Sequence, residues 1–174
     1  DGLFVGALIH ELLRTGQIDL DYLIRYTNAA WLVIDDPGSP SHGTFARDAA
    51  GKPLVFDRGK KTVMSAHDVN AQPQLSGSIV TPDGRRALPV MELLAKRFLG
   101  DDYAPDAVAK ETGVPADTIR RIAAELADVA FRQEISLPIA WTDWAGRRHE
   151  KMVGRPIAMH AMRGISAHSN GFHT

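Results

Sequence analysis

The 174-residue sequence has no cysteine, which excludes disulfides, thiolate zinc sites and cysteine-held iron–sulfur clusters within it. It also has no apolar run approaching the roughly 20 residues of a membrane-spanning helix, and no basic N-terminal region followed by a cleavage site. Charge of one sign is not in excess, because the formal net charge is −1. Electrostatics therefore gives no reason to expect nucleic acid or an anionic membrane surface as the main partner.

Self-contained catalytic motifs are missing as well. The chain has no Gly-x-Ser-x-Gly elbow, phosphate-binding loop, internal repeat or low-complexity segment. His10-Glu11 lacks the second histidine of a zinc-protease motif, and Asp35-Asp36 is typical of a solvated turn. The spacing of His160, His168 and His173 matches no compact metal site. The sequence thus offers no complete catalytic site and no metal site of its own.

What is present is an ordinary globular composition, with 44% hydrophobic and 24% charged residues. We expect one domain over 1–174, containing an irregular insertion at 36–87 and a polar loop at 141–155. Both ends look cut, because Asp1-Gly2 opens directly into an amphipathic helix and the last residues read as a helical turn. We therefore expect a fragment of a longer parent protein.

Hydrophobic periodicity, caps and turn residues predict alternating helices and short strands. Asp19 can cap the second helix, and Gly16 can end the first. The helices are expected at 3–15, 20–26, 89–99, 105–111 and 115–127, and the strands at 31–34, 44–47, 53–56, 79–81, 135–140 and 156–160. This order is typical of a parallel α/β layer, and we expect a truncated Rossmann-like domain with helices around a small, mostly parallel sheet.

The last expected strand leads into a turn whose residues could bind an anionic ligand. In parallel α/β folds, ligands bind at the carboxyl ends of strands, against helix N-termini. Gly164 allows close backbone approach, Ser166 can cap the next helix, and Arg163 offers a bidentate fork to an anion. The simpler alternative is that Gly164 and Ser166 only turn a strand into a helix.

Several motifs follow one another in a specific order. Asp1-Gly2 opens a helix, 18–28 is an acidic and hydrophobic segment containing Arg-Tyr-Thr, and Tyr103-Ala104-Pro105 precedes the Thr-Gly-Val helix pair at 112–123. A strand then runs into 162–171. This succession resembles the middle of a molybdopterin oxidoreductase large subunit of the dimethyl sulfoxide reductase superfamily. The resemblance covers both ends and the centre, but not 36–87 or 132–155.

The resemblance implies a cofactor, molybdenum bis(molybdopterin guanine dinucleotide), and residues that bind it. Asp1 matches the aspartate of the family's Gly-Thr-Asp motif, which contacts this cofactor. The strand-to-helix turn contacts it too, and the matching residues are Arg163, Gly164, Ser166, Ala167 and His168. Family members often have Met and Gln where Arg163 and Ala167 stand, so we expect contact chiefly through the backbone around Gly164. The molybdenum ligand and an iron–sulfur cluster are expected upstream of this segment.

The resemblance implies that this chain is one part of a larger enzyme. The chain would belong to the cofactor-binding region of a molybdenum-dependent oxidoreductase, and alone it would be inactive. The expected partners are the rest of the catalytic subunit, an iron–sulfur electron-transfer subunit, a membrane anchor subunit and a small anionic substrate, with no nucleic acid. The resemblance implies a cytoplasmic location, with the periplasmic side as an alternative.

The segment Trp141–Glu150 and the turn Met159–Gly164 look most like large subunits that act on sulfur oxyanions, in particular sulfite dehydrogenase-type enzymes. The cationic side chains available for a dianionic substrate or the cofactor phosphates are Arg147, Arg148, His149, Arg163 and His168. The alternative for Arg147 and Arg148 is a solvated surface loop with Trp141 and Trp144 packed beneath it.

A second hypothesis comes from a different class. The segment 107–127 has the short helix, glycine turn and second helix of a helix-turn-helix, with Arg120 and Arg121 where a recognition helix contacts DNA. Acidic residues on the same helix, such as Asp117 and Glu125, would repel phosphate. A DNA- or protein-binding module is therefore the alternative, and an αα-hairpin packed on the domain is the structural explanation.

Overall fold

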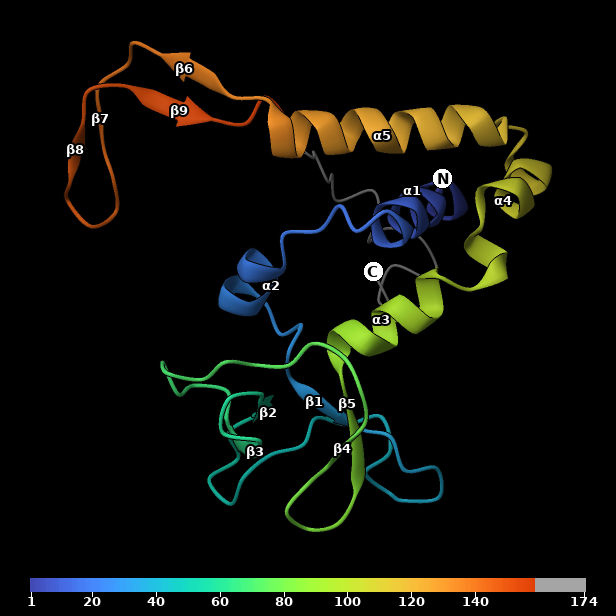
Figure 1. Cartoon of the computed structure of the whole chain (residues 1–174), viewed down its shortest axis with the longest axis vertical. Helices are drawn as coiled ribbons and strands as arrows, with labels where there is room; N and C mark the ends of the chain where they lie inside the picture. The colour runs from blue at the N-terminus through green and yellow to red at the C-terminus, as the bar shows by residue number, and fades with distance from the viewer. Residues whose placement is uncertain (159–174) are drawn as a thin grey trace. The chain divides into compact units, whose positions relative to one another are not determined.

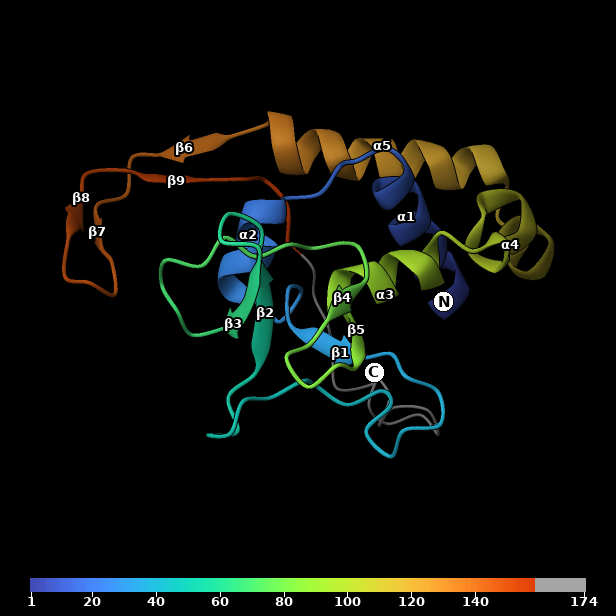
Figure 2. The same ribbon diagram turned by 60° about the horizontal axis from the view of Figure 1, so that its bottom comes forward.

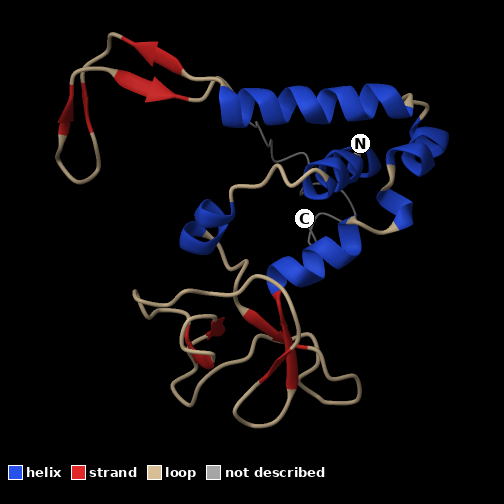
Figure 3. Cartoon of the chain, in the orientation of Figure 1, coloured by secondary structure: helices blue, strands red, loops and turns tan. Residues whose placement is uncertain are grey.

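A computed structural model describes residues 1–158 of the chain. These residues belong to two compact units, one from Asp1 to Arg120 and one from Arg121 onward, and each is described by itself. Figure 3 shows that both helices and strands are present, so the α/β class is confirmed in general terms. The expectation that 1–174 forms one domain of a longer chain remains a prediction. Within 1–158 no helix combines the length and apolarity needed to span a membrane.

The helices of the first unit lie where periodicity and caps predicted them. They are α1 (Gly2–Arg14), α2 (Leu20–Tyr26), α3 (Val90–Phe98), the short 3-10 helix η1 (Asp101–Tyr103) and α4 (Pro105–Thr112), all labelled in Figure 1 except η1. Asp19 caps α2 by accepting a hydrogen bond of 2.9 Å from the Tyr22 N–H. Gly16, at φ +67°, follows the end of α1. The helix α5 (Ala116–Arg132) begins in the first unit and continues into the second.

The helix α1 packs against α3, α4 and η1. Its contact with η1 depends on Gly6, because a Cβ there would clash with Cδ1 of the Tyr103 ring. A hydrogen bond of 2.8 Å joins Nδ1 of the buried His10 to the carbonyl of Phe98 at the end of α3. The Phe98 ring in turn lies 4.9 Å from the Tyr103 ring, centroid to centroid. One face of α1 therefore holds the neighbouring helices together by close packing and one directional bond.

The sheets of the first unit are antiparallel, which corrects the expected parallel sheet. The strand β5 (Arg86–Pro89) lies between β1 (Leu32–Ile34) and β4 (Ile79–Val80), and it pairs antiparallel with both. The hairpin of β2 (Leu54–Asp57) and β3 (Thr62–Ser65), seen side by side in Figures 1 and 2, is antiparallel too. A parallel pair needs a crossover connection, usually a helix, whereas the chain between β1 and β5 contains hairpins and turns. The described residues thus give no support to a Rossmann-like arrangement.

The segment 36–87 supplies much of the core of this sheet region. The buried cluster contains Leu32, Ile34, Ala46, Ile79 and Ala87. Half-buried Leu54, Phe56 and Val63 pack against it. Strands expected at 53–56 and 79–81 are confirmed, while 44–47 takes part only in isolated bridges at Phe45 and Arg47. The sequence analysis predicted an irregular insertion here, whereas residues of this segment form part of the buried core.

A buried carboxylate organises the β2–β3 turn. Asp57 is 1% exposed and accepts hydrogen bonds of 2.6 Å from the N–H groups of Lys60 and Gln72. These bonds, from Lys60 first and Gln72 next, lower the pKa of the Asp57 carboxyl below its ordinary value. The turn also holds Lys61 at φ +53°, an unusual conformation for a residue with a side chain. Asp57 therefore ties residues 57–61 to the segment that follows β3.

The second unit consists of the rest of α5 and a β-ribbon, described as far as Ala158. The strand β6 (Ile135–Leu137) pairs with β9 (Met152–Gly154), and β7 (Trp141–Thr142) pairs with β8 (Arg148–His149), both antiparallel. The expected polar loop at 141–155 is therefore a short hairpin followed by a strand. The strand expected at 156–160 is not present at 156–158, and its last two residues lie outside the described part.

The close approach at Gly6 predicts the cost of a single methyl group. In the purified chain, Gly6→Ala is expected to lower the free energy of unfolding by about 1–3 kcal/mol, because Tyr103 must move. Urea unfolding followed by circular dichroism measures this. Gly2→Ala is the matched control, since nothing lies within 4 Å of a Cβ there and alanine favours the helix. Equal stabilities of the two variants would contradict the packing described.

The Asp57 carboxylate predicts a pH-dependent stability. Because its pKa is lowered on folding, its contribution is complete above the unfolded value of about 3.9 and is lost as the pH falls through the folded value. Asp57→Asn removes the charge at every pH. The gap in urea midpoint between wild type and variant should be widest near neutral pH and narrow below about pH 3.9. A gap that stays constant between neutral and acidic pH would show that the charge is not what matters.

Candidate functional site

Asp1 is the one expected cofactor-binding residue within the described part. It occupies the N-cap position of α1 and its carbonyl accepts a hydrogen bond of 3.0 Å from the Val5 N–H. Its side chain is exposed and forms no capping hydrogen bond. The Asp1 carboxylate is therefore accessible to a ligand, and it can act only as a hydrogen-bond acceptor when ionised.

The other expected cofactor-binding residues lie outside the described residues. They are Arg163, Gly164, Ser166, Ala167 and His168. Their contact with the cofactor stays a prediction. Among residues 1–158, no group of three or more histidine, aspartate or glutamate side chains is placed to hold a metal ion.

Two of the cationic residues expected for an anionic substrate, Arg147 and His149, meet at Asp143 in the hairpin of β7 and β8. Arg147 donates through Nε to Asp143 Oδ2 at 2.8 Å, and His149 Nε2 lies 3.1 Å from the same oxygen. Arg148 instead pairs through Nε with Glu150 at 3.3 Å. The N–H of Arg147 and then the His149 ring lower the pKa of Asp143, so this carboxylate is ionised at neutral pH. Each expected anion ligand in the hairpin already has a carboxylate partner.

The two tryptophans do not form a packed layer beneath this hairpin. Trp141 stacks on the His149 ring, with centroids 4.7 Å apart and planes at 18°, and its Nε1 donates to the carbonyl of Lys151 at 3.2 Å. Trp144 is 96% exposed, so its expected packing is wrong. The hairpin is held together by Asp143 and by the Trp141–His149 stack, and Trp144 is displayed outside both.

The segment that resembles a helix-turn-helix contains the expected glycine turn. Its two arginines, however, form ion pairs with carboxylates of the same unit or the same helix. Gly113 adopts φ +74° after α4, as a turn between two helices requires. Arg120 forms ion pairs with Asp106 of α4 and with Asp117, and Arg121 pairs with Glu125 at 2.6 Å. Carboxylates that already hold these guanidinium groups oppose phosphate binding. The segment is therefore accounted for by helix packing and surface ion pairs.

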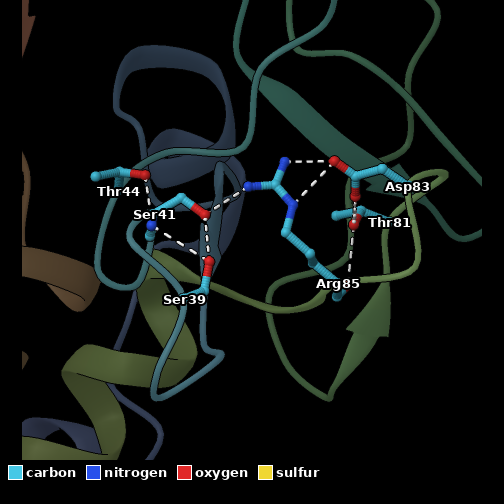
Figure 4. A network of polar contacts seen from close by, with 6 residues as sticks. All are labelled: Ser39, Ser41, Thr44, Thr81, Asp83 and Arg85. Carbon is cyan, nitrogen blue, oxygen red and sulfur yellow. Dashed lines mark hydrogen bonds and ion pairs between the residues drawn. The ribbon is translucent and has the colours of Figure 1, made fainter.

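A polar network that sequence reasoning missed joins two loops of the first unit (Figure 4). Arg85 donates through Nη1 to Ser41 Oγ at 2.6 Å and through Nε to Asp83 Oδ2 at 2.9 Å. Thr81 Oγ1 bonds Asp83 Oδ1 at 2.5 Å, and Ser39 and Ser41 share a bond of 2.9 Å. The Arg85 hydrogen bonds, followed by that of Thr81, lower the pKa of Asp83. Thr44 also joins the network, through a bond from Oγ1 to the Ser41 carbonyl.

This network borders a cavity of about 420 Å³ that Ala46, Arg47, Leu54, Val63 and Met64 also line. Within the network the charge of Arg85 is balanced by that of Asp83, with which it forms an ion pair. The hydrogen bonds of the network therefore hold the loop that follows β1 against the turn before β5. The sequence signal for it is the pair of charges on either side of Gly84, a turn residue at φ +85°.

Comparison with known proteins identifies a relative. No protein-family profile matches the chain. The sequence is 46% identical over 184 aligned positions to a sulfite dehydrogenase subunit of Allochromatium vinosum, and the alignment covers the whole chain. The chain is related to part of an oxidoreductase subunit. It spans 19% of the length of that relative, so the greater part of the related protein has no counterpart in these 174 residues.

The hydrogen bonds of Asp143 predict which variant disrupts the hairpin. Asp143→Asn is expected to speed amide hydrogen exchange of Ala145 and Arg147 on the order of tenfold, because both N–H groups donate to the charged oxygen at 2.9 Å. Exchange measured by NMR reads this directly. Glu150→Gln, which removes only the negative charge that faces Arg148, should leave both rates unchanged.

Proposed function

We propose that this chain is part of the molybdopterin guanine dinucleotide-binding region of the large subunit of a molybdenum oxidoreductase that acts on a sulfur oxyanion such as sulfite. The observation that supports this most is the 46% identity, over the whole chain, to a protein named as a sulfite dehydrogenase subunit. The activity belongs to the longer protein. The chain alone is expected to be inactive, because the molybdenum ligand and the iron–sulfur cluster come from elsewhere in the parent.

The Asp1 carboxylate is a hydrogen-bond acceptor that suits one end of the cofactor. A carboxylate accepts hydrogen bonds and donates none when ionised, so it suits the N–H groups of a guanine and repels the pyrophosphate oxygens. The Asp1 side chain is exposed and is not occupied in capping α1. When bound, the molybdenum cofactor supplies two-electron redox chemistry, while the protein contributes binding, orientation and electrostatics. The role proposed for Asp1 is to hold the guanine end.

Binding of the anionic substrate or of the cofactor phosphates is assigned to the turn rather than to the hairpin. Arg147 and His149 share the Asp143 carboxylate, and Arg148 pairs with Glu150, so two carboxylates already offset the positive charge of the hairpin. Arg163 and His168 lie on either side of Gly164 in the sequence, and if the helix expected from the sequence begins there, its first backbone N–H groups would add to the attraction of an oxyanion. We therefore do not assign anion binding to the cationic residues of the hairpin, because they already form ion pairs.

The full-length protein that contains this segment provides the test. Elemental analysis and fluorescence of the oxidised pterin should give molybdenum with about two pterins per chain, and the protein should oxidise sulfite. Absence of both molybdenum and pterin, in a host that makes the cofactor, would overturn the proposal.

A single variant tests the role of Asp1. Asp1→Ala in the full-length protein is expected to lower the guanine nucleotide released on acid hydrolysis by several-fold, because the acceptor for the guanine N–H groups is lost. Asp21→Ala, an exposed carboxylate in the first turn of α2, is the matched control and should retain the wild-type amount. Full retention in Asp1→Ala would remove Asp1 from the site.

A further inference from the structure

The loop between β4 and β5 contains a chemically reactive peptide bond, Asp83–Gly84. In an Asp–Gly pair the glycine nitrogen can attack the aspartate side chain, because glycine has no Cβ to hinder the approach. The sequence has two such pairs, Asp1–Gly2 and Asp83–Gly84. Only the aspartate of the second pair belongs to the polar network of Figure 4, so it is there that the network can control the reaction.

The reaction is an isomerisation that uses no reagent other than water. The Gly84 nitrogen loses its proton and bonds to Cγ of Asp83, and one carboxyl oxygen leaves as water, which closes a five-membered succinimide ring. Water then opens the ring at either carbonyl. Opening at Cγ restores aspartate, whereas opening at the main-chain carbonyl leaves isoaspartate, whose backbone runs through the former side chain. Ring closure requires a protonated carboxyl, whose oxygen can leave, and a free nitrogen held close to Cγ.

The network keeps the Asp83 carboxyl in its ionised, unreactive form. Its Oδ2 accepts a hydrogen bond of 2.9 Å from Nε of Arg85, and its Oδ1 accepts one of 2.5 Å from the Thr81 hydroxyl. Hydrogen bonds to a charged carboxylate favour it over the acid and fix its orientation. Arg85 is itself anchored on the opposite loop by the bond from Nη1 to Ser41. Both oxygens that could leave as water are therefore held by partners.

The loop also occupies the attacking nitrogen. The Gly84 N–H donates to the Thr81 carbonyl at 2.9 Å, and the Thr81 N–H donates to the Arg85 carbonyl at 2.9 Å. The residues at the two ends of the loop, Val80 and Arg86, are paired in the β4–β5 ladder. The Gly84 nitrogen must give up its hydrogen bond before it can lose its proton and turn toward Cγ. The backbone of the loop therefore opposes ring closure as well.

The turn itself does not require this reactive pair. The loops 48–52 and 143–147 have the same two backbone hydrogen bonds, from the first N–H to the fifth carbonyl and from the glycine N–H to the first carbonyl. Their glycines, Gly51 and Gly146, stand at φ +78°, close to the +85° of Gly84. The residue before the glycine is alanine in both of these loops. The backbone of the turn therefore does not account for an aspartate at position 83, whereas the bonds to Arg85 and Thr81 do.

We propose that Asp83–Gly84 is a latent site of isoaspartate formation, which the Arg85 ion pair and the Thr81 hydroxyl keep unreactive in the folded protein. Isoaspartate would add a methylene group to the backbone of the loop and displace the carboxylate that Arg85 holds. Because Arg85 also holds Ser41, the connection between the two loops would be lost with it. The inference is independent of the proposed function, because it concerns bonds within the first unit alone.

The first experiment compares the folded protein with a free peptide. The full-length protein and a synthetic peptide of residues 79–88 are incubated in warm neutral buffer, and isoaspartate at residue 83 is quantified by chromatographic separation of the isomeric fragments. The peptide contains the same neighbouring residues without their fixed geometry. The folded protein should isomerise about tenfold more slowly or less, because hydrogen bonds of the network must break first. Equal rates in protein and peptide would overturn the inference.

A matched pair of variants at Thr81 tests the hydroxyl bond in the full-length protein. Thr81→Val removes the hydroxyl with little change in volume and should raise the isomerisation rate several-fold, whereas Thr81→Ser keeps the hydroxyl and should stay close to the wild-type rate. An equal rise in both variants would show that packing around this buried residue, and not its bond to Asp83, controls the reaction, and would overturn the role of the hydroxyl.

The ion pair is tested by Arg85→Gln, which should raise the isomerisation rate on the order of tenfold. Arg86→Gln is the matched control, because it changes the net charge equally at the next residue but removes an ion pair of 2.9 Å with Asp35 instead. Circular dichroism of the same samples shows whether each variant is folded, and if Arg85→Gln is not, the pair at Thr81 decides. A folded Arg85→Gln that isomerises no faster than Arg86→Gln would overturn the inference.

Discussion

The antiparallel pairing of β1 with β5 is the constraint on which the first unit depends. It joins Leu32–Ile34 to Ala87–Pro89 and closes a loop of more than fifty residues into a sheet with its own core. The strand β5 runs directly into α3, whose first N–H groups, from Val90 and Met91, donate to the carbonyls of Trp31 and Ala29. The same contact therefore sets both the sheet and the start of α3, which then meets α1. Loss of this pairing would separate the sheet region from the helices.

Local sequence signals predicted the helices, but they did not predict how strands far apart in the sequence pair. Capping at Asp19, the stop at Gly16 and the apolar period of α1 all depend on residues a few positions apart, and the structure confirms them. The direction of a strand pair depends on where the chain returns. Pro89 shows the difficulty, since it reads as the start of a helix and is in fact the last residue of β5, opposite Leu32. A proline at that point ends the ladder and opens the helix at once.

The candidate site residues come mainly from resemblance, and their role stays a prediction. Asp1 is exposed, as a ligand contact requires, while the residues around Gly164 lie outside the described part. The sequence analysis offered Arg147, Arg148 and His149 as anion ligands. The structure pairs Arg147 and His149 with Asp143, and Arg148 with Glu150, which the sequence analysis did not predict. Its role was readable in principle, because the pattern Asp-x-Ala-Gly-basic occurs twice and binds backbone N–H groups in the same way both times. No pattern could show that the side chain of the tryptophan within it is exposed.

The hydrogen bond between His10 and the carbonyl of Phe98 has a further consequence, for the state of the imidazole ring. A carbonyl oxygen only accepts, so Nδ1 of His10 must carry the proton, and the neutral ring is held in the less common of its two tautomers. Nitrogen chemical shifts distinguish the two forms. The nitrogen shifts of the His10 ring thus report whether α1 and α3 are in contact.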